Sequence, residues 1–155
     1  MSETIENRLK NLGVTLPAAA APAGSYVPYT QSGKVIFTAG QLPLKDGKLA
    51  VTGLLGRDVQ TAEGQQAAKL CAINVLAQAK AAAGGDLGRI TRLVKITVFV
   101  ASAPDFAEQH LVANGASDFL VEVLGEAGKH ARSAVGVAAL PLNAAVEVEA
   151  VLEVE

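Results

Sequence analysis

The sequence predicts an α+β domain, a two-layer sandwich in which two helices cover one face of a mixed β-sheet. Two observations support this fold class. Segments in which apolar and polar residues alternate, as they do in strands, occur near both ends of the chain and once in its middle. Two longer segments with helical spacing lie between them, so the order is strands, helix, strand, helix, strand, strand.

Composition limits the class of protein. The chain has 155 residues, which fits one domain with a proper hydrophobic core. Hydrophobic residues make up 50% of it and charged residues 18%, as is typical of a globular protein. The formal net charge is -2, aromatic residues make up 4%, and there is no Trp. The basic and stacking surface of a general nucleic-acid binder is therefore absent, and nucleic acid is not an expected partner.

The cysteine content and the apolar runs indicate the compartment. Cys71 is the only cysteine, which excludes an internal disulfide and a thiolate zinc site. The opening MSETIENRLKNLG is too polar for a secretory signal. No uncharged apolar run reaches the ~18 to 20 residues that span a bilayer. We therefore expect a cytoplasmic protein that does not insert into membranes.

The N-terminal part predicts a short amphipathic helix and a connector. Apolar residues at near-helical spacing precede a glycine that would end the helix: Ile5, Leu9, Leu12 and Gly13. The following LPAAAAPAGS is a small-residue segment that we expect on the surface. The ordered body begins near Tyr26. We therefore predict an N-terminal extension, 1–25, and a domain, 26–155.

The first half of the domain combines hairpins with a long helix. VPYTQSG and KVIFTAGQLPL read as two strands around a Ser-Gly turn, and LKDGKLAV offers an Asp-Gly hairpin turn. DVQTAEGQQAAKLCAINVLAQAKAAAGGD then has helical spacing and ends at two glycines. Its predicted inward face consists of small and apolar residues: Ala67, Leu70, Cys71, Asn74, Val75 and Ala79. Cys71 is interpreted as a core residue, since no pairing His or Cys-X-X-Cys motif surrounds it.

The second half predicts a strand, a helix and two further strands. In TRLVKITVFVAS, Val94, Ile96, Val98 and Val100 alternate onto one face. DFAEQHLVANGASDFLVEVLGEAG is helical, with a predicted interruption at Asn114–Gly115 and an end around 125–128. RSAVGVAAL and AAVEVEAVLEVE are strands separated by a turn at Pro141–Asn143. In the last strand Val146, Val148, Ala150, Leu152 and Val154 form one face, and Glu147, Glu149 and Glu153 form the other.

The sheet face without helices is expected to carry Ala39, Thr97, Ala134 and Gly136. These small and mixed residues make it too apolar in places to be left fully in water. Contact between the sheets of neighbouring subunits would cover it. The sequence therefore predicts an oligomer.

Three segments carry a resemblance to a known family. VPYTQSGKVIFTAGQLPL, LVKITVFVAS followed by PDFAE, and HARSAVGVAALPLNAAVEVEA resemble, in this order, the Rid family of reactive-intermediate deaminases. These proteins are also known as YjgF-like and as perchloric-acid-soluble endoribonucleases. The resemblance runs from about Tyr26 to the C-terminus. It implies a chorismate-mutase-like fold, a homotrimer with three clefts between subunits, and hydrolysis of enamines and imines to 2-keto acids and ammonia without a metal or organic cofactor.

The resemblance also implies the two principal site residues. Arg132 matches the arginine that grips the substrate carboxylate, a bidentate geometry that lysine would not reproduce. Its alternative is a structural ion pair with a neighbouring glutamate. Glu147 matches the first glutamate of the family's Glu-X-Glu strand, which holds or activates the attacking water. Its alternative is a solvated acid on the outer face, the interpretation we give to Glu149 and Glu153.

The remaining ligand-binding candidates are Tyr29, Ala39, Gly40 and Ala134. Gly40 matches a position where a backbone amide approaches the ligand, and Tyr29 matches a tyrosine that lines the cleft or is a packing residue. The best-characterised deaminases resemble TSGQIP and ARSCVEV, whereas this chain reads TAGQLP and ARSAVGV. Ala39 and Ala134 thus replace a hydroxyl and a thiol.

Three functional hypotheses follow. The first is a 2-iminobutanoate/2-iminopropanoate deaminase-like hydrolase, and the second is a non-catalytic protein that binds a small carboxylate-bearing metabolite, a 2-imino or 2-keto acid. An RNase role, suggested only by the older family name, comes third. Other motifs are weak: His110 and His130 lack the spacing of a metal site, and no His and Asp arrangement would activate Ser133.

Overall fold

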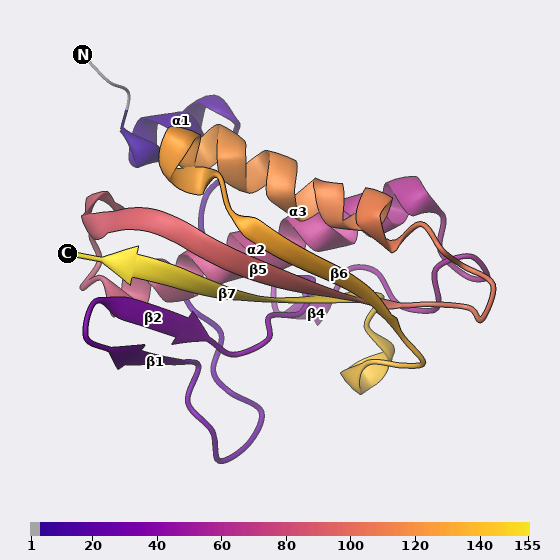
Figure 1. Cartoon of the computed structure of the whole chain (residues 1–155). Helices are drawn as coiled ribbons and strands as arrows, with labels where there is room; N and C mark the ends of the chain where they lie inside the picture. The colour runs from indigo at the N-terminus through magenta and orange to yellow at the C-terminus, as the bar shows by residue number, and fades with distance from the viewer. Residues whose placement is uncertain (1–3) are drawn as a thin grey trace.

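The computed structural model describes residues 4–155 and consists of a helical layer on a sheet (Figure 1). The five strands of the main sheet are β1 (Tyr29–Ser32), β2 (Val35–Thr38), β5 (Ile90–Ala101), β6 (Ala131–Val137) and β7 (Val146–Val154). A small hairpin is formed by β3 (Leu44–Lys45) and β4 (Lys48–Leu49). The α-helices are α1 (Ile5–Asn11), α2 (Thr61–Ala82) and α3 (Gln109–Leu124). Short 3-10 turns are η1 (Leu87–Arg89), η2 (Gly125–Gly128) and η3 (Pro141–Asn143).

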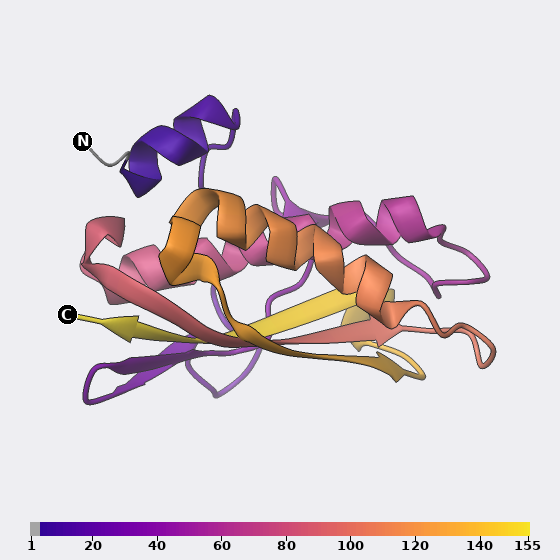
Figure 2. The ribbon, with the colours of Figure 1, turned by 45° about the horizontal axis from the view of Figure 1, so that its top comes forward.

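The strand order β1-β2-β7-β5-β6 confirms the predicted mixed sheet. β5 and β6 pair in parallel because α3 carries the chain back between them, whereas the other neighbours pair antiparallel. α2 and α3 cover one face, which Figure 2 shows from the side. The two-layer α+β architecture is therefore as predicted. β6 forms one edge of the sheet, and its outer backbone edge has no neighbouring strand among residues 4–155.

The core lies between the two helices and the sheet. The predicted inward face of β7 is buried, with Val146, Val148 and Leu152 fully inaccessible. Alanines of α2 let this helix lie close to the strands, and Cys71 is buried among them as predicted. In β5 the pairing register with β7 shifts between Leu93 and Lys95. This irregularity buries Leu93 in place of the predicted Val94, so the predicted alternation holds only from Ile96 onward.

The predicted interruption of the second long helix at Asn114–Gly115 is wrong. α3 runs without a break from Gln109 to Leu124. Gly115 serves a packing purpose, because a Cβ atom built there would overlap the backbone carbonyl of Gln65 in α2. The glycine therefore marks a close approach of the two helices and does not break α3.

The composition predicted for the uncovered face needs a correction. Ala134 and Gly136 lie on the helix-covered side of β6, where a Cβ on Gly136 would meet the side chains of Gln109 and Ser102. Large apolar residues project from the other side. Phe37 is 45% exposed and Val135 is 43% exposed. The uncovered face is thus more apolar than predicted, which supports the idea of a partner there; the homotrimer itself stays a prediction.

The turns and the N-terminal helix follow local sequence signals. Asp46 and Gly47 have φ values of 53° and 78°, the left-handed pair that an Asp-Gly hairpin turn requires. The predicted N-terminal helix forms as α1, with Leu9 buried and Arg8 donating a hydrogen bond of 3.1 Å to the carbonyl of Val123 in α3.

The division into 1–25 and 26–155 stays a prediction. Within residues 4–155, no helix has the length and apolarity needed to cross a membrane.

Candidate functional site

The first part of the candidate site is formed by Glu147 and Gly40. Alternation along β7 places Glu147 on the uncovered face, beside Phe99 of β5. Gly40 follows β2, and a Cβ atom built on it would overlap the carboxylate of Glu147. The backbone at Gly40 and the Glu147 carboxylate are therefore in contact. Any larger residue at position 40 would have to displace the carboxylate.

Burial raises the pKa of the half-buried Glu147 carboxyl above its ordinary value, and the negative charge of Glu149 raises it further. Within residues 4–155, no ion pair involves this carboxylate and no hydrogen bond lowers its pKa. A carboxylate in such surroundings is a stronger base than one in water. It is thus better suited than an exposed carboxylate to take a proton from a water molecule.

A cavity of about 140 Å³ borders Gly40. Ala39, Gly40 and Gln41 line one side of it, and the N-terminal connector, including Ala23 and Tyr26, lines another. The connector is fixed by the fully buried Gln78 of α2, whose side-chain amide donates a hydrogen bond of 2.9 Å to the carbonyl of Ala20. Sequence reasoning missed the connector's part in this cavity because no local motif links residues so far apart.

Tyr29 lies apart from this cavity. It is the first residue of β1, pairs with Thr38 of β2, and packs against the buried core. Tyr26 lines the cavity instead, and its hydroxyl accepts a hydrogen bond of 3.2 Å from the backbone amide of Ala23. Within one chain, the position of Tyr29 therefore fits the packing alternative. Its role in binding stays a prediction.

The second part of the candidate site is Arg132 on the edge strand β6. The guanidinium of this half-buried residue reaches α3, where Nη1 donates hydrogen bonds of 2.9 Å to Oδ1 of Asn114 and 3.2 Å to Oγ of Ser117. Nη2 donates a third, of 3.3 Å, to the carbonyl of His110. All three acceptors are neutral.

The absence of an acidic partner for Arg132 bears on its alternative interpretation. The ion pairs within residues 4–155 are Arg57–Asp58, Lys80–Glu6 and Lys129–Glu126, and Arg132 belongs to none of them. The predicted alternative of a structural ion pair with a glutamate is therefore not seen in this part of the chain. The guanidinium is oriented, and its charge is left to interact with an anion.

The two parts of the site face opposite sides of the sheet. Arg132 pairs with Ile96, whose side chain is fully buried under the helices, whereas Glu147 pairs with Phe99 on the uncovered face. Ala134 shares the face of Arg132 and packs against the core. One chain thus brings Gly40 into contact with Glu147, places Ala39 beside Gly40 on the cavity, and keeps Arg132 with Ala134 elsewhere.

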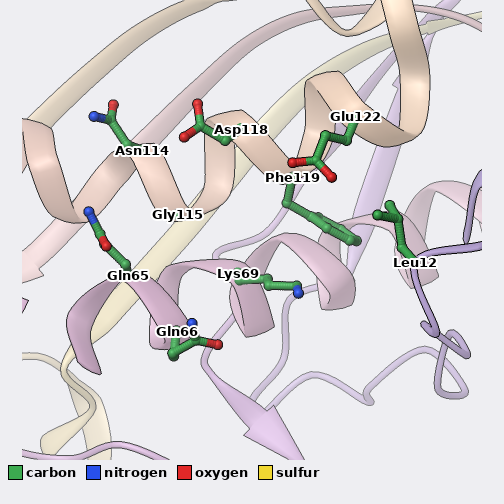
Figure 3. A pocket seen from close by; sticks show the side chains of 9 residues that line it. All are labelled: Leu12, Gln65, Gln66, Lys69, Asn114, Gly115, Asp118, Phe119 and Glu122. Atoms are coloured by element: carbon green, nitrogen blue, oxygen red, sulfur yellow. The ribbon is translucent and has the colours of Figure 1, made fainter. Parts of the chain in front are cut away.

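A further pocket of about 200 Å³ lies on the outside of the helical layer (Figure 3). Gln65, Gln66 and Lys69 come from α2, and Asn114, Asp118 and Glu122 come from α3. Lys69 lies over the ring of Phe119, with Nζ 5.5 Å from the ring centroid. Asn114 links this pocket to Arg132, but Glu147 lies on the other side of the sheet.

Neither the buried cysteine nor the potential metal ligands form a second site in residues 4–155. Burial raises the pKa of the Cys71 thiol well above its ordinary value, so the reactive thiolate is disfavoured. Its Sγ contacts the carbonyl of Val146 at 3.5 Å, as expected for a core residue. Among residues 4–155, no three or more His, Cys, Asp or Glu side chains lie together in a way that could hold a metal ion.

Comparison with known proteins identifies the family. Residues 6–154 match the family described as "YjgF/chorismate_mutase-like, putative endoribonuclease". The chain therefore belongs to the YjgF-like, or Rid, family, as its motifs predicted. Among curated relatives, Protein TCP17 of Trypanosoma cruzi is 52% identical over 153 residues, which cover 98% of this chain and 95% of that protein. A 2-iminobutanoate/2-iminopropanoate deaminase of Salmonella typhimurium is 37% identical over 139 residues, covering 88% and 94%.

Solved structures share the fold. The protein Atu1372 of Agrobacterium tumefaciens, described as having unknown function, superposes with a TM-score of 0.92 at 58% identity, covering 97% of this chain and 92% of that one. TdcF of E. coli with bound serine gives a TM-score of 0.64 at 29% identity, covering 88% and 94%. The fold is thus shared with a protein described as having unknown function and with one whose structure contains bound serine.

Proposed function

We propose that this protein hydrolyses reactive 2-imino acids, such as 2-iminobutanoate, and their enamine tautomers to 2-keto acids and ammonia. The observation that carries the proposal is the contact between Gly40 and the half-buried Glu147, whose pKa burial raises. A carboxylate of this kind is suited to activate water. The deaminase names of relatives at 29% and 37% identity support the same reaction.

The site is completed between subunits. Arg132 and Glu147 lie on opposite faces of one sheet, so a ligand the size of an imino acid cannot touch both within one chain. Arg132 lies on the edge strand β6, whose outer edge a neighbouring subunit can approach. The exposed Phe37 and Val135 give that neighbour an apolar surface to cover. We infer a homotrimer in which Arg132 of one subunit faces Gly40 and Glu147 of the next.

The reaction then needs two binding contacts and one base. Arg132 binds the substrate carboxylate through charge-assisted hydrogen bonds. Glu147 takes a proton from water as the oxygen attacks C2 of the imine, and the C=N π electrons move to nitrogen, which receives that proton from Glu147. In the resulting carbinolamine Glu147 transfers the hydroxyl proton to the amino nitrogen, so the C–N bond breaks, ammonia leaves and the C=O bond of the 2-keto acid forms. The cavity of about 140 Å³ beside Gly40 suits a small aliphatic side chain.

The second candidate is a protein that binds small carboxylates without catalysis. Ala39 and Ala134 support it, because they offer no hydroxyl or thiol where the best-characterised deaminases have one. The serine bound to TdcF shows that a relative of this fold binds a small amino acid. Arg132 could retain such binding after the chemistry had been lost.

A coupled assay separates the two functions. Threonine dehydratase generates 2-iminobutanoate in the cuvette, and its decay is followed with and without the protein. Faster decay at catalytic protein concentration supports the deaminase. Binding of 2-ketobutyrate without acceleration supports the carboxylate-binding protein. If the protein shows neither acceleration nor binding, both functions are contradicted.

A further inference from the structure

The hydrogen bonds of Arg132 continue beyond α3 to a histidine. Ser117 Oγ, which accepts from Arg132 at 3.2 Å, also lies 2.9 Å from Nε2 of His130. Nδ1 of His130 lies 2.6 Å from the carbonyl oxygen of Gly128. Three side chains and one backbone group thus form a continuous chain from the guanidinium to η2.

For a neutral imidazole, the direction of each hydrogen bond in this chain follows from its two ends. The carbonyl of Gly128 can only accept, so Nδ1 of His130 carries a hydrogen. In the neutral imidazole Nε2 is then an acceptor, and the hydroxyl of Ser117 donates to it. Since the Ser117 hydrogen points to His130, a lone pair of Oγ is available to Arg132. Arg132 donates to Ser117, Ser117 to His130, and His130 to Gly128.

We propose that Ser117 and His130 are positioning residues, which orient the Arg132 guanidinium for the substrate carboxylate. This inference rests on the proposed function, because it takes Arg132 as the carboxylate-binding group. An arginine side chain has many rotamers, and fixing them before the ligand arrives reduces the entropy lost on binding. Neutral acceptors do this without neutralising the guanidinium. An acidic partner would hold Arg132 equally well but would compete with the ligand.

The arrangement also explains why a histidine stands before Ala131 and Arg132. His130 lies between η2 and β6, so its ring is anchored to a backbone carbonyl two residues earlier. A fixed ring holds the Ser117 hydroxyl in one rotamer. Ser117 in turn lies one helical turn after Asn114, the other side-chain acceptor of Arg132.

The test compares Ser117→Ala and His130→Phe with two conservative variants, Ser117→Thr and His130→Gln, which keep a hydroxyl and a neutral acceptor. Ser32→Ala, an exposed serine in β1, is the matched control. For each protein, calorimetry gives the Kd for 2-ketobutyrate, the coupled assay gives kcat and KM for 2-iminobutanoate, and a melting curve gives Tm. ¹⁵N NMR of the Arg132 side chain reports its order, and the imidazole spectrum reports the His130 tautomer.

We expect Ser117→Ala and His130→Phe to weaken 2-ketobutyrate binding by about three- to tenfold, because a less ordered guanidinium loses more entropy when the ligand binds. KM should rise by a similar factor while kcat changes little, since Glu147 is untouched. The order of the Arg132 side chain should fall. Ser117→Thr and His130→Gln should recover most of each effect, and Ser117→Ala should add nothing in an Arg132→Ala background.

Two results would overturn the positioning role. One is a lower Tm with unchanged 2-ketobutyrate affinity and unchanged Arg132 order, which would make Ser117 and His130 a purely structural link between α3 and β6. The other is a His130 ring protonated only at Nε2. If the wild type neither binds 2-ketobutyrate nor hydrolyses 2-iminobutanoate, the proposed function fails, and the Arg132 order and the His130 tautomer still decide whether these residues orient the guanidinium.

Discussion

The Glu147 carboxylate and the Arg132 guanidinium have opposite kinds of surroundings. Arg132 donates hydrogen bonds to Asn114, Ser117 and the carbonyl of His110, so its orientation is fixed and its charge stays uncompensated. Glu147 has no such support within residues 4–155; it is half buried against Gly40, and its pKa is raised by burial and by Glu149.

The difference matches the two tasks of an imine hydrolase. A group that binds a carboxylate must be held in place and keep its charge, whereas a general base works best when its pKa lies close to the operating pH. The fold also keeps the two groups on opposite faces of the sheet, which prevents them from forming an ion pair within one chain. The following changes test this comparison, beginning with the largest expected effect.

Glu147→Gln should lower turnover of 2-iminobutanoate by ~10² to 10⁴, the range for the loss of a general base. Binding of 2-ketobutyrate should be nearly unchanged, because Arg132 remains. The coupled assay and calorimetry measure the two effects. Glu153→Gln, which removes a carboxylate from the same face of β7 that does not contribute to the pKa shift of Glu147, is the matched control and should change turnover little. Unchanged turnover in Glu147→Gln would assign this residue to the solvated face.

Gly40→Ala should lower turnover by about 10²-fold, because the added methyl displaces the Glu147 carboxylate by roughly an ångström. The φ angle of Gly40 does not lie in the left-handed region, so an alanine causes no backbone strain there. The far end of the glutamate side chain can also move, so the fold should survive. In a Glu147→Gln background the same substitution should have little further effect. Full additivity of the two changes would show that Gly40 does not act through Glu147.

Arg132→Ala should weaken binding of 2-ketobutyrate at least tenfold, since charge-assisted hydrogen bonds contribute ~1.5 to 3 kcal/mol. Arg132→Lys should restore only part of the affinity, because an ammonium lacks the planar fork. Tm should change little, since the three acceptors that lose a donor are neutral and partly accessible. Calorimetric titrations beside melting curves measure both. A destabilised variant with full affinity would refute the anion-binding role.

Ala39→Ser should raise turnover by up to about fivefold if the hydroxyl forms one additional hydrogen bond worth ~1 kcal/mol. Ala39 lines the cavity beside Gly40, so the new hydroxyl would face the space proposed for the substrate. The assay is the same coupled reaction. A decrease in turnover would show that the alanine is required by the shape of this cavity.

The pH dependence of stability gives the smallest effect. Because burial raises the pKa of Glu147 in the folded state, the folded protein binds this proton more tightly than the unfolded chain does. The free energy of unfolding therefore falls as pH rises from the unfolded pKa through the folded pKa. Glu147→Gln should raise Tm at about pH 7 and have no effect at about pH 3, where both states are protonated. A lower Tm at about pH 7 would show that the folded protein stabilises the carboxylate.

Sequence reasoning predicted the elements whose signals are local. The alternation of Val146, Val148 and Glu147, the Asp-Gly turn and the alanine-rich α2 are each specified by neighbouring residues. The predicted break at Gly115 was wrong because that glycine is needed for the close approach of Gln65 in another helix. The register shift in β5 was missed for a similar reason, since it depends on pairing with β7.

The candidate site was predictable only in part. The motifs gave Arg132, Glu147 and Gly40, and the structure shows that Gly40 contacts Glu147. The sequence could not show that Arg132 lies on the other face, because the face of β6 depends on how this strand pairs with β5. The roles of Ser117 and His130 could not be predicted from the sequence either, because their link to Arg132 depends on the position of α3.

Subunit complementation tests most directly whether the site is shared between chains. Arg132→Ala subunits, which bind substrate weakly, and Glu147→Gln subunits, which turn it over slowly, are unfolded together in equal amounts and refolded. Mass spectrometry confirms mixed trimers, and activity is measured at substrate concentrations below KM. If Arg132 of one subunit serves Glu147 of the next, every mixed trimer has one intact site, and about a quarter of wild-type activity should return. Mixed trimers with no more activity than the separate variants would contradict a site assembled between subunits.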